Sequence, residues 1–220
     1  MNLWVKICGN TSLADAQLAA DAGADAVGFV FASSPRRVSV EQVAKITPNL
    51  PAALGKIGVF VDADFAAIAD AIEQCGLTGV QLHSTDSGNL SAELRDRFGP
   101  ALRILRVIHF ADDVAQQLQS AAADAAIDGV LVDSRTATAV GGTGIAFDWQ
   151  AARETIFSGQ SRLKLVAAGG LSPANVAEAI ATLRPWGVDV VSGVEAAPGI
   201  KDAQKVHEFV ANARAAERSL

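Results

Sequence analysis

Short apolar runs recur along the chain at nearly regular intervals, and each is apolar throughout instead of alternating with polar residues. A run without alternation predicts a strand that is buried on both faces, as the strands of a parallel sheet are. The runs begin about 26 residues apart on average, which is the length of a strand followed by a helix. We count eight of them: Leu3–Ile7, Ala26–Phe31, Lys56–Val61, Gly79–Leu82, Arg103–Ile108, Gly129–Val132, Leu163–Ala167 and Val188–Val191.

Alanine-rich amphipathic segments separate these runs and predict helices. Ser172-Pro173 predicts a helix start, because a serine hydroxyl can cap a helix and proline suits its first position. Glycines between a helix and the next strand predict left-handed C-caps at Gly23, Gly76, Gly99 and Gly187. The clearest helical segments are Ser12–Ala22, Asp64–Cys75 and Ser172–Leu183.

The same strand and helix pattern fills residues 1–220 without a linker or a shift in composition. We therefore expect one α/β domain, a closed (β/α)8 TIM barrel with parallel strands. The alternative is an open doubly wound sheet, which typically has about six strands and a G-x-G-x-x-G turn after the first. No such turn follows Leu3–Ile7, so the barrel is favoured.

Charge and cysteine content narrow the range of partners. The net charge is −6, with 18 Lys+Arg against 24 Asp+Glu, which argues against binding to nucleic acid or to an anionic membrane. Cys8 and Cys75 are too few for a disulfide framework, and no secretory signal precedes Leu3. No apolar run approaches the roughly 20 residues of a membrane span. We expect a cytoplasmic protein with reduced thiols.

Most candidate catalytic groups follow the apolar runs, at the carboxyl ends where barrel enzymes place their chemistry. Residues two apart on a strand share a face, so Lys6 lies with Cys8. Cys8 could then face Asp133 across the barrel mouth, as an acid and a base on opposite sides of a small substrate. The groups are Lys6, Cys8, Arg36, Asp62, Gln81, His83, His109, Asp133, Gly169-Gly170 and Ser192-Gly193.

Two glycine segments predict a phosphate site. Gly169-Gly170 follows the seventh run and Ser192-Gly193 follows the eighth, the two positions that commonly bind phosphate in such barrels. Exposed backbone N–H groups can hold phosphate without a cationic side chain, which suits an acidic protein.

Seven short motifs stand at the predicted strand ends, in order along nearly the whole chain: Lys6-Ile7-Cys8-Gly9, Ser34-Pro35-Arg36, Gln81-Leu82-His83, Asp133-Ser134, Gly141-Gly142-Thr143-Gly144 with Phe147-Asp148-Trp149, Ala168-Gly169-Gly170-Leu171, and Ser192-Gly193-Val194-Glu195 with Pro198-Gly199-Lys201-Asp202. Together they resemble the phosphoribosylanthranilate isomerase family of tryptophan biosynthesis. The resemblance implies an aldose–ketose isomerase that performs an Amadori rearrangement. It would convert N-(5-phosphoribosyl)anthranilate to 1-(2-carboxyphenylamino)-1-deoxyribulose 5-phosphate, without a cofactor or a metal.

The resemblance also implies the catalytic roles. Asp133 would be the general acid that opens the furanose ring, and Cys8 the general base that removes the proton from C2. A thiol is a poor base at neutral pH unless a charge favours the thiolate, and we expect Lys6 to supply it. Asp133 would have to hold a proton, which burial favours.

The remaining assignments concern substrate binding. We expect Arg36, in preference to Arg37, to pair with the anthranilate carboxylate, because its planar fork can make a bidentate contact. The phosphate would rest on the two glycine segments, with Gln81 and His83 facing the sugar or the ring. Gly142 would belong to a mobile lid over 141–144. Asp189 would form a supporting interior ion pair with Lys6.

Two other functions are compatible with a phosphate-binding barrel. Indole-glycerol-phosphate synthase has a similar phosphate cradle, but it would require a Lys/Glu catalytic set that the strand ends lack. A non-enzymatic phosphosugar-binding barrel would need no facing acid and base. His109 and His207 have no partners at metal-ligand spacing, so we expect no metal site. The expected partner is a small phosphosugar–anthranilate, and the sequence leaves monomer and homodimer open.

Overall fold

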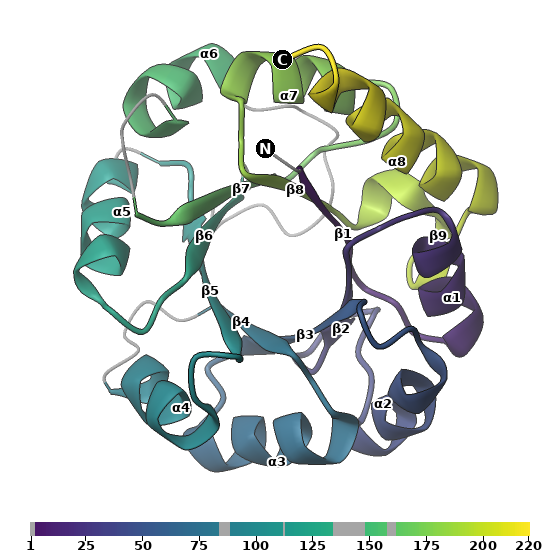
Figure 1. The fold of residues 1–220 in the computed structure, drawn as a ribbon, viewed down its shortest axis with the longest axis vertical. Coiled ribbons are helices and arrows are strands. Elements are labelled where there is room, and N and C mark those ends of the chain that lie inside the picture. The colour runs from purple at the N-terminus through teal and green to yellow at the C-terminus, as the bar shows by residue number, and fades with distance from the viewer. Residues whose placement is uncertain (1–2, 84–88, 112, 134–147, 158–161) are drawn as a thin grey trace.

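The computed structural model describes residues 3–83, 89–111, 113–133, 148–157 and 162–220. Its eight long strands form one closed parallel barrel in chain order, with β1 beside β8, which confirms the predicted TIM barrel (Figure 1). The strands are β1 Trp4–Ile7, β2 Ala26–Val30, β3 Gly55–Val61, β4 Gly79–His83, β5 Arg103–His109, β6 Gly129–Asp133, β7 Lys164–Ala168 and β8 Gly187–Val190.

Helices surround the barrel on its outside (Figure 1). No described helix is both long enough and apolar enough to cross a membrane. A short hairpin, β9 Glu195–Ala197 with β10 Ile200–Lys201, follows the last barrel strand. The helices are α1 Leu13–Asp21, α2 Val40–Ile46, α3 Phe65–Cys75, α4 Leu90–Phe98, α5 Val114–Ala123, α6 Trp149–Ala152, α7 Val176–Leu183 and α8 Ala203–Glu217, with the short turns η1 Thr47–Asn49, η2 Arg153–Phe157 and η3 Ser192–Val194.

The barrel interior is apolar toward the amino ends of the strands and polar toward their carboxyl ends. Trp4, Ile57 and Leu105 belong to the apolar cluster that fills the lower part. Lys6 and Asp189 lie further along β1 and β8, almost fully buried and paired with each other. Because an unpaired buried charge is costly, the interior tolerates polar groups only where they are mutually satisfied. This division places the reactive groups at one rim.

Several strand ends differ from the sequence prediction. β4, β5 and β6 each extend one residue further, so that His83, His109 and Asp133 are the last residues of their strands. His109 is aligned with Asp133, and Asp133 with Ala168, in the parallel register. The backbone at these positions is therefore fixed by the sheet instead of belonging to loops.

The predicted start of α7 at Ser172 is wrong by several residues. The helix begins at Val176 after Asn175, whose side chain accepts a hydrogen bond from the Ser172 N–H at 2.8 Å and closes a turn instead. Its C-cap is Arg184 in the left-handed conformation, with φ 48°, and Gly187 begins β8. Gly76 confirms its prediction as the left-handed C-cap of α3.

Candidate active site

A buried hydrogen-bonded chain crosses the barrel interior below the carboxyl rim. Lys6 Nζ in β1 donates to Asp189 Oδ1 in β8 at 2.8 Å and to Gln81 Oε1 in β4 at 2.9 Å. The Gln81 side-chain nitrogen lies 3.0 Å from His83 Nε2 at the rim. The expected ion pair between Lys6 and Asp189 is confirmed. These hydrogen bonds thus connect β4 across the barrel to the neighbouring strands β1 and β8, beneath the site.

Cys8 lies directly after β1 and is 3% exposed. Its backbone N–H donates to the Val190 carbonyl at 2.9 Å, which fixes the residue against the end of β8. The thiol lies over Gly28 of β2, where an added Cβ would come within 2.4 Å of Cys8 Sγ. Gly28 therefore provides the space that the thiol occupies, a role that the sequence analysis did not assign.

Burial and the neighbouring cations act on the pKa of Cys8 in opposite directions. Burial raises the pKa of the Cys8 thiol and the Asp189 carboxylate raises it further, while Lys6 lowers it; the net shift is upward. Burial alone would lower the pKa of Lys6, but Asp189 and Cys8 outweigh it, so the ammonium is retained. Lys6 therefore favours the thiolate as expected, but desolvation is the larger effect on the pKa of Cys8.

Asp133 ends β6 and is 3% exposed. Leu131, two residues earlier, belongs to the interior cluster, so the alternation of side chains turns Asp133 toward the barrel mouth. β6 lies three strands from β1, by way of β8 and β7. His109, aligned with Asp133 on β5, has a buried Nδ1 without a hydrogen-bond partner among the described residues. Two titratable side chains thus lie on the side of the rim away from Cys8.

Arg36 follows β2 and makes a bidentate ion pair with a protein carboxylate. Its Nε and Nη2 donate to Glu195 at 2.8 and 2.7 Å. Glu195 Oε1 also accepts from Lys201 Nζ at 3.2 Å, and the same ammonium donates to the Cys8 carbonyl at 2.6 Å. Arg37 is exposed at the surface. Of the two arginines, Arg36 is therefore the one connected, through Glu195 and Lys201, to the backbone of Cys8.

The two glycine segments meet at the rim between β7 and β8. Gly169 and Gly170 both have positive φ angles, of 80° and 66°, which favour glycine at consecutive positions. An added Cβ at Gly193 would lie 1.9 Å from the Leu171 carbonyl oxygen, so only glycine allows the two loops to approach this closely. Ser192 and Gly170 are exposed. Gly142 and the expected lid over 141–144 lie outside the described residues.

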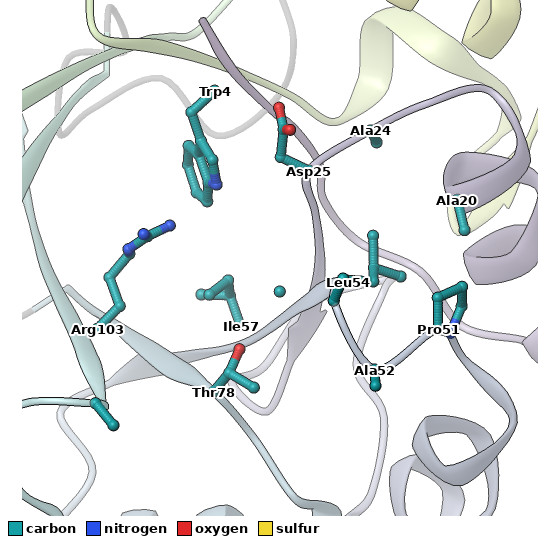
Figure 2. A pocket seen from close by; sticks show the side chains of 13 residues that line it. Trp4, Ala20, Ala24, Asp25, Pro51, Ala52, Leu54, Ile57, Thr78 and Arg103 are labelled. Atoms are coloured by element: carbon teal, nitrogen blue, oxygen red, sulfur yellow. The ribbon is translucent and has the colours of Figure 1, made fainter. Parts of the chain in front are cut away.

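The opposite rim holds a cavity of 540 Å³ (Figure 2). It is lined at the amino ends of the strands, where the Trp4 and Arg103 side chains point toward one another, and no residue expected in the site contributes to it. Asp25 at its wall pairs with Arg214 at 2.7 Å. No group of three or more His, Cys, Asp or Glu side chains in the described part of the chain could hold a metal ion.

Comparison with known proteins decides the family. The model of the family described as N-(5'-phosphoribosyl)anthranilate (PRA) isomerase matches residues 5–212. This chain belongs to that family. The N-(5'-phosphoribosyl)anthranilate isomerases of Trichlorobacter lovleyi and Magnetococcus marinus are each 42% identical to it, covering 96% and 99% of this chain and 98% of each relative. The crystal structure of the Thermotoga maritima phosphoribosyl anthranilate isomerase matches with a TM-score of 0.83 and 35% identity, over 97% of this chain and 100% of that one.

Membership confirms the resemblance drawn from the seven motifs: the chain is an isomerase enzyme of tryptophan biosynthesis with the family's barrel. The indole-glycerol-phosphate synthase and the non-enzymatic binding barrel are thereby set aside. A second similar crystal structure, with a TM-score of 0.80, 33% identity and coverage of 97% of this chain and 100% of that one, is a phosphoribosyl anthranilate isomerase in complex with reduced 1-(o-carboxyphenylamino)-1-deoxyribulose 5-phosphate.

Sequence reasoning missed three residues that build the site. Glu195 and Lys201 were noted only as parts of a motif, and Gly28 only as part of an apolar run. A glycine inside a strand that is otherwise Ala, Val and Phe was the available signal for Gly28, since such a glycine often marks a close approach. The ion pair of Glu195 with Arg36 joins residues 159 positions apart, for which the spacing gave no signal.

Proposed function

We propose that the chain converts N-(5'-phosphoribosyl)anthranilate to 1-(2-carboxyphenylamino)-1-deoxyribulose 5-phosphate, with Asp133 as general acid and Cys8 as general base. The observation that carries the proposal is the placement of these two buried side chains at the ends of β6 and β1, on one rim with the paired glycine loops. The complex of a similar enzyme with a reduced form of this compound supports the choice of product.

The reaction needs a proton added at the ring oxygen, a proton removed from C2, and a final tautomerisation that removes the hydroxyl proton and adds one at C1. Asp133 donates its proton to the ring oxygen while the bond from that oxygen to C1 breaks, and the nitrogen lone pair forms the C=N bond of a Schiff base. Cys8, as its thiolate, then takes the proton from C2; the C–H electron pair forms a C1=C2 double bond and the C=N π pair returns to nitrogen. The resulting enol loses its O–H proton and gains a proton at C1, which gives the ketone. Because electrons move only within the substrate, the rearrangement requires no redox cofactor.

The raised pKa of Cys8 fits this order of events. In the free site burial raises the pKa of the Cys8 thiol, against the charge of Lys6. Opening of the ring creates a positive iminium beside it, and a nearby positive charge lowers the pKa of a thiol. The iminium therefore favours loss of the thiol proton to solvent, and the thiolate that remains is the form that can accept the proton from C2. A positioned acid and a positioned base each typically contribute about 10²–10⁴ in rate.

The substrate carries a carboxylate and a phosphate, and the rim has a separate place for each. Arg36 would receive the anthranilate carboxylate, since its planar guanidinium suits a carboxylate and Glu195 fixes its position at the rim. The loops at Gly169-Gly170 and Ser192-Gly193 would receive the phosphate through backbone N–H groups. Gln81 and His83 would face the sugar or the ring, and Gly142 would belong to the lid that covers them.

A fluorescence assay tests the proposal. Purified protein should accelerate the loss of anthranilate-ring fluorescence from freshly generated phosphoribosylanthranilate, and mass-preserving conversion should be visible by chromatography. Free anthranilate, the product of hydrolysis, serves as the control because its fluorescence persists. A decay no faster than in buffer would overturn the proposed function.

A further inference from the structure

Two buried charged residues next to the site have no part in the proposed proton transfers. Glu195 at the start of β9 is 7% exposed, and Lys201 at the end of β10 is 6% exposed. Charged side chains are rarely buried to this degree unless they are paired, because desolvation is costly. The hairpin that carries them brings both charges to the carboxyl rim, between Arg36 and Cys8.

Glu195 holds the guanidinium of Arg36 from one side. Both of its oxygens accept, at 2.8 Å from Nε and 2.7 Å from Nη2, and Oε1 also accepts from the Gly199 N–H at 3.3 Å. A bidentate contact fixes the plane of a guanidinium as well as its position. Gly9 lies against the same side chain, and an added Cβ there would come within 2.9 Å of Arg36 Cδ.

Lys201 donates a hydrogen bond to the backbone of Cys8, the proposed base. Its Nζ donates to the Cys8 carbonyl at 2.6 Å and to the Val191 carbonyl at 3.3 Å, which are the chain positions just after β1 and β8. Its third contact is Glu195 Oε1 at 3.2 Å. One ammonium group therefore ties together the base and the segment that leads into Ser192-Gly193, and it links both to the carboxylate that fixes Arg36.

The charges of this group are consistent with an anion site. Glu195 balances one of the two cations, so the trio is net positive when all three are ionised. Burial alone would raise the pKa of Glu195, but Arg36 and Lys201 outweigh it and hold the pKa below its usual range. Burial lowers the pKa of Lys201, and Glu195 and Cys8 oppose that shift. The carboxylate thus supports both cations.

We propose that Glu195 and Lys201 are positioning residues of the isomerase reaction: Glu195 acts on substrate binding through Arg36, and Lys201 acts on proton abstraction through Cys8. This division of labour rests on the proposed function of Cys8 and Arg36. In this proposal the β9–β10 hairpin fixes the position of Arg36, which binds the substrate carboxylate, relative to that of Cys8, the base.

Steady-state kinetics separate the two roles. Glu195→Gln keeps the shape of the side chain and removes its charge, and it should raise KM about 10-fold with kcat nearly unchanged. Lys201→Met should lower kcat about 10-fold or more with KM nearly unchanged, and Lys201→Arg should recover most of the loss. Equal changes in kcat and KM for both variants would overturn the proposal.

The opposite rim provides matched controls. Lys56 is also a buried lysine that donates to two backbone carbonyls, those of Pro51 and Leu54, both at 3.2 Å. Asp25 pairs with Arg214. Lys56→Met and Asp25→Asn should therefore reproduce any loss of stability without the kinetic changes. If Lys56→Met lowers kcat as much as Lys201→Met does, the fall in kcat reflects a general loss of stability. Lys201 is then not a positioning residue.

A double-mutant cycle tests whether Glu195 acts through Arg36. In the Arg36→Ala background, Glu195→Gln should raise KM no further, because the group it positions is gone. If the double variant raises KM by the product of the two single effects, this part of the proposal is overturned. An Arg36→Ala enzyme with unchanged KM would overturn it as well.

Alkylation of Cys8 by iodoacetamide tests Lys201 without substrate. The peptide carrying Cys8 is quantified apart from that carrying Cys75, at a series of pH values. The midpoint of Cys8 alkylation should move to higher pH in Lys201→Met and stay in place in Lys56→Met. Identical profiles would reject the hold of Lys201 on Cys8. If the profile differs between the wild-type protein and Lys201→Met, but the wild-type protein does not convert phosphoribosylanthranilate, the proposed function alone is rejected.

Discussion

Cys8 lies between a charge that favours its thiolate and a burial that opposes it. The sequence identified the thiol and the neighbouring charge of Lys6, because alternation along a strand places residues 6 and 8 on one face. It did not predict the net direction of the pKa, which depends on how much water the folded barrel removes and on Asp189 from β8. The sequence therefore predicted the residue but not the net direction of its pKa shift.

Substitution of the proposed acid and base should act on turnover. Cys8→Ser and Asp133→Asn should each lower kcat by about 10²-fold or more while KM changes little, because proton transfer occurs only in the transition state. Arg36→Ala should act mainly by raising KM. Initial rates across a range of substrate concentrations measure both parameters. An Asp133→Asn enzyme with near-normal kcat would contradict the assignment of the acid.

Gly28 should matter for the reaction although it carries no side chain. In Gly28→Ala the new methyl would meet Cys8 Sγ at 2.4 Å, so the thiol must move, and kcat should fall. Gly58→Ala is the control: its methyl would crowd Phe60 at 2.6 Å in the outer layer, away from the thiol. It should lower the midpoint of urea unfolding and leave kcat unchanged. Equal kcat values for both variants would show that Gly28 is only a packing residue.

At the scale of elements, helix ends were predicted less well than strands. Ser12, the first residue of the predicted helical segment Ser12–Ala22, caps α1 and accepts from the Asp15 N–H at 3.1 Å. Ser172 and Gly187 had the right residue types for a start and a stop, yet the chain uses Asn175 and Arg184. Local preferences for caps are small, about 1 kcal/mol, so the way α7 packs on the barrel decides its limits.

Two left-handed C-caps should respond in opposite directions. Arg184 has φ 48° and Gly76 has φ 58°, and an added Cβ at Gly76 would meet nothing within 4 Å. Arg184→Gly should raise the free energy of unfolding by about 0.5 kcal/mol and Gly76→Ala should lower it by about 1 kcal/mol, since only backbone strain changes. Urea unfolding measures both. A loss of stability in Arg184→Gly would mean that contacts of the arginine outweigh its strain.

At the scale of the whole molecule, the second thiol makes stability depend on pH. Burial, with the charge of Asp70, raises the pKa of Cys75 from 9.0 to about 11. Between these values the folded state keeps a proton that the unfolded state has lost, so this group's contribution to stability falls as pH rises. Cys75→Ala should therefore flatten the fall in the free energy of unfolding between about pH 9 and about pH 11. The slope of the free energy of unfolding against pH is compared between the wild-type protein and Cys75→Ala, because the packing lost in the variant lowers its stability at every pH.

The sequence by itself determined the eight parallel units, the barrel that closes them and the rim that bears the chemistry. The reason is local: a strand covered on both faces must be apolar throughout, and polar residues can follow only where it ends. Cys8, Arg36 and Asp133 were identified on that basis and by their resemblance to family motifs.

The tertiary structure alone decided how these residues are held. Closure of the barrel brings Asp189 to Lys6 and Gly28 beneath Cys8, and the hairpin after β8 brings Glu195 to Arg36 and Lys201 to the Cys8 carbonyl. Each of these contacts joins distant parts of the chain, and each depends on strand order and register more than on neighbouring residues. Desolvation in the closed interior then raises the pKa of the Cys8 thiol, which no local pattern records.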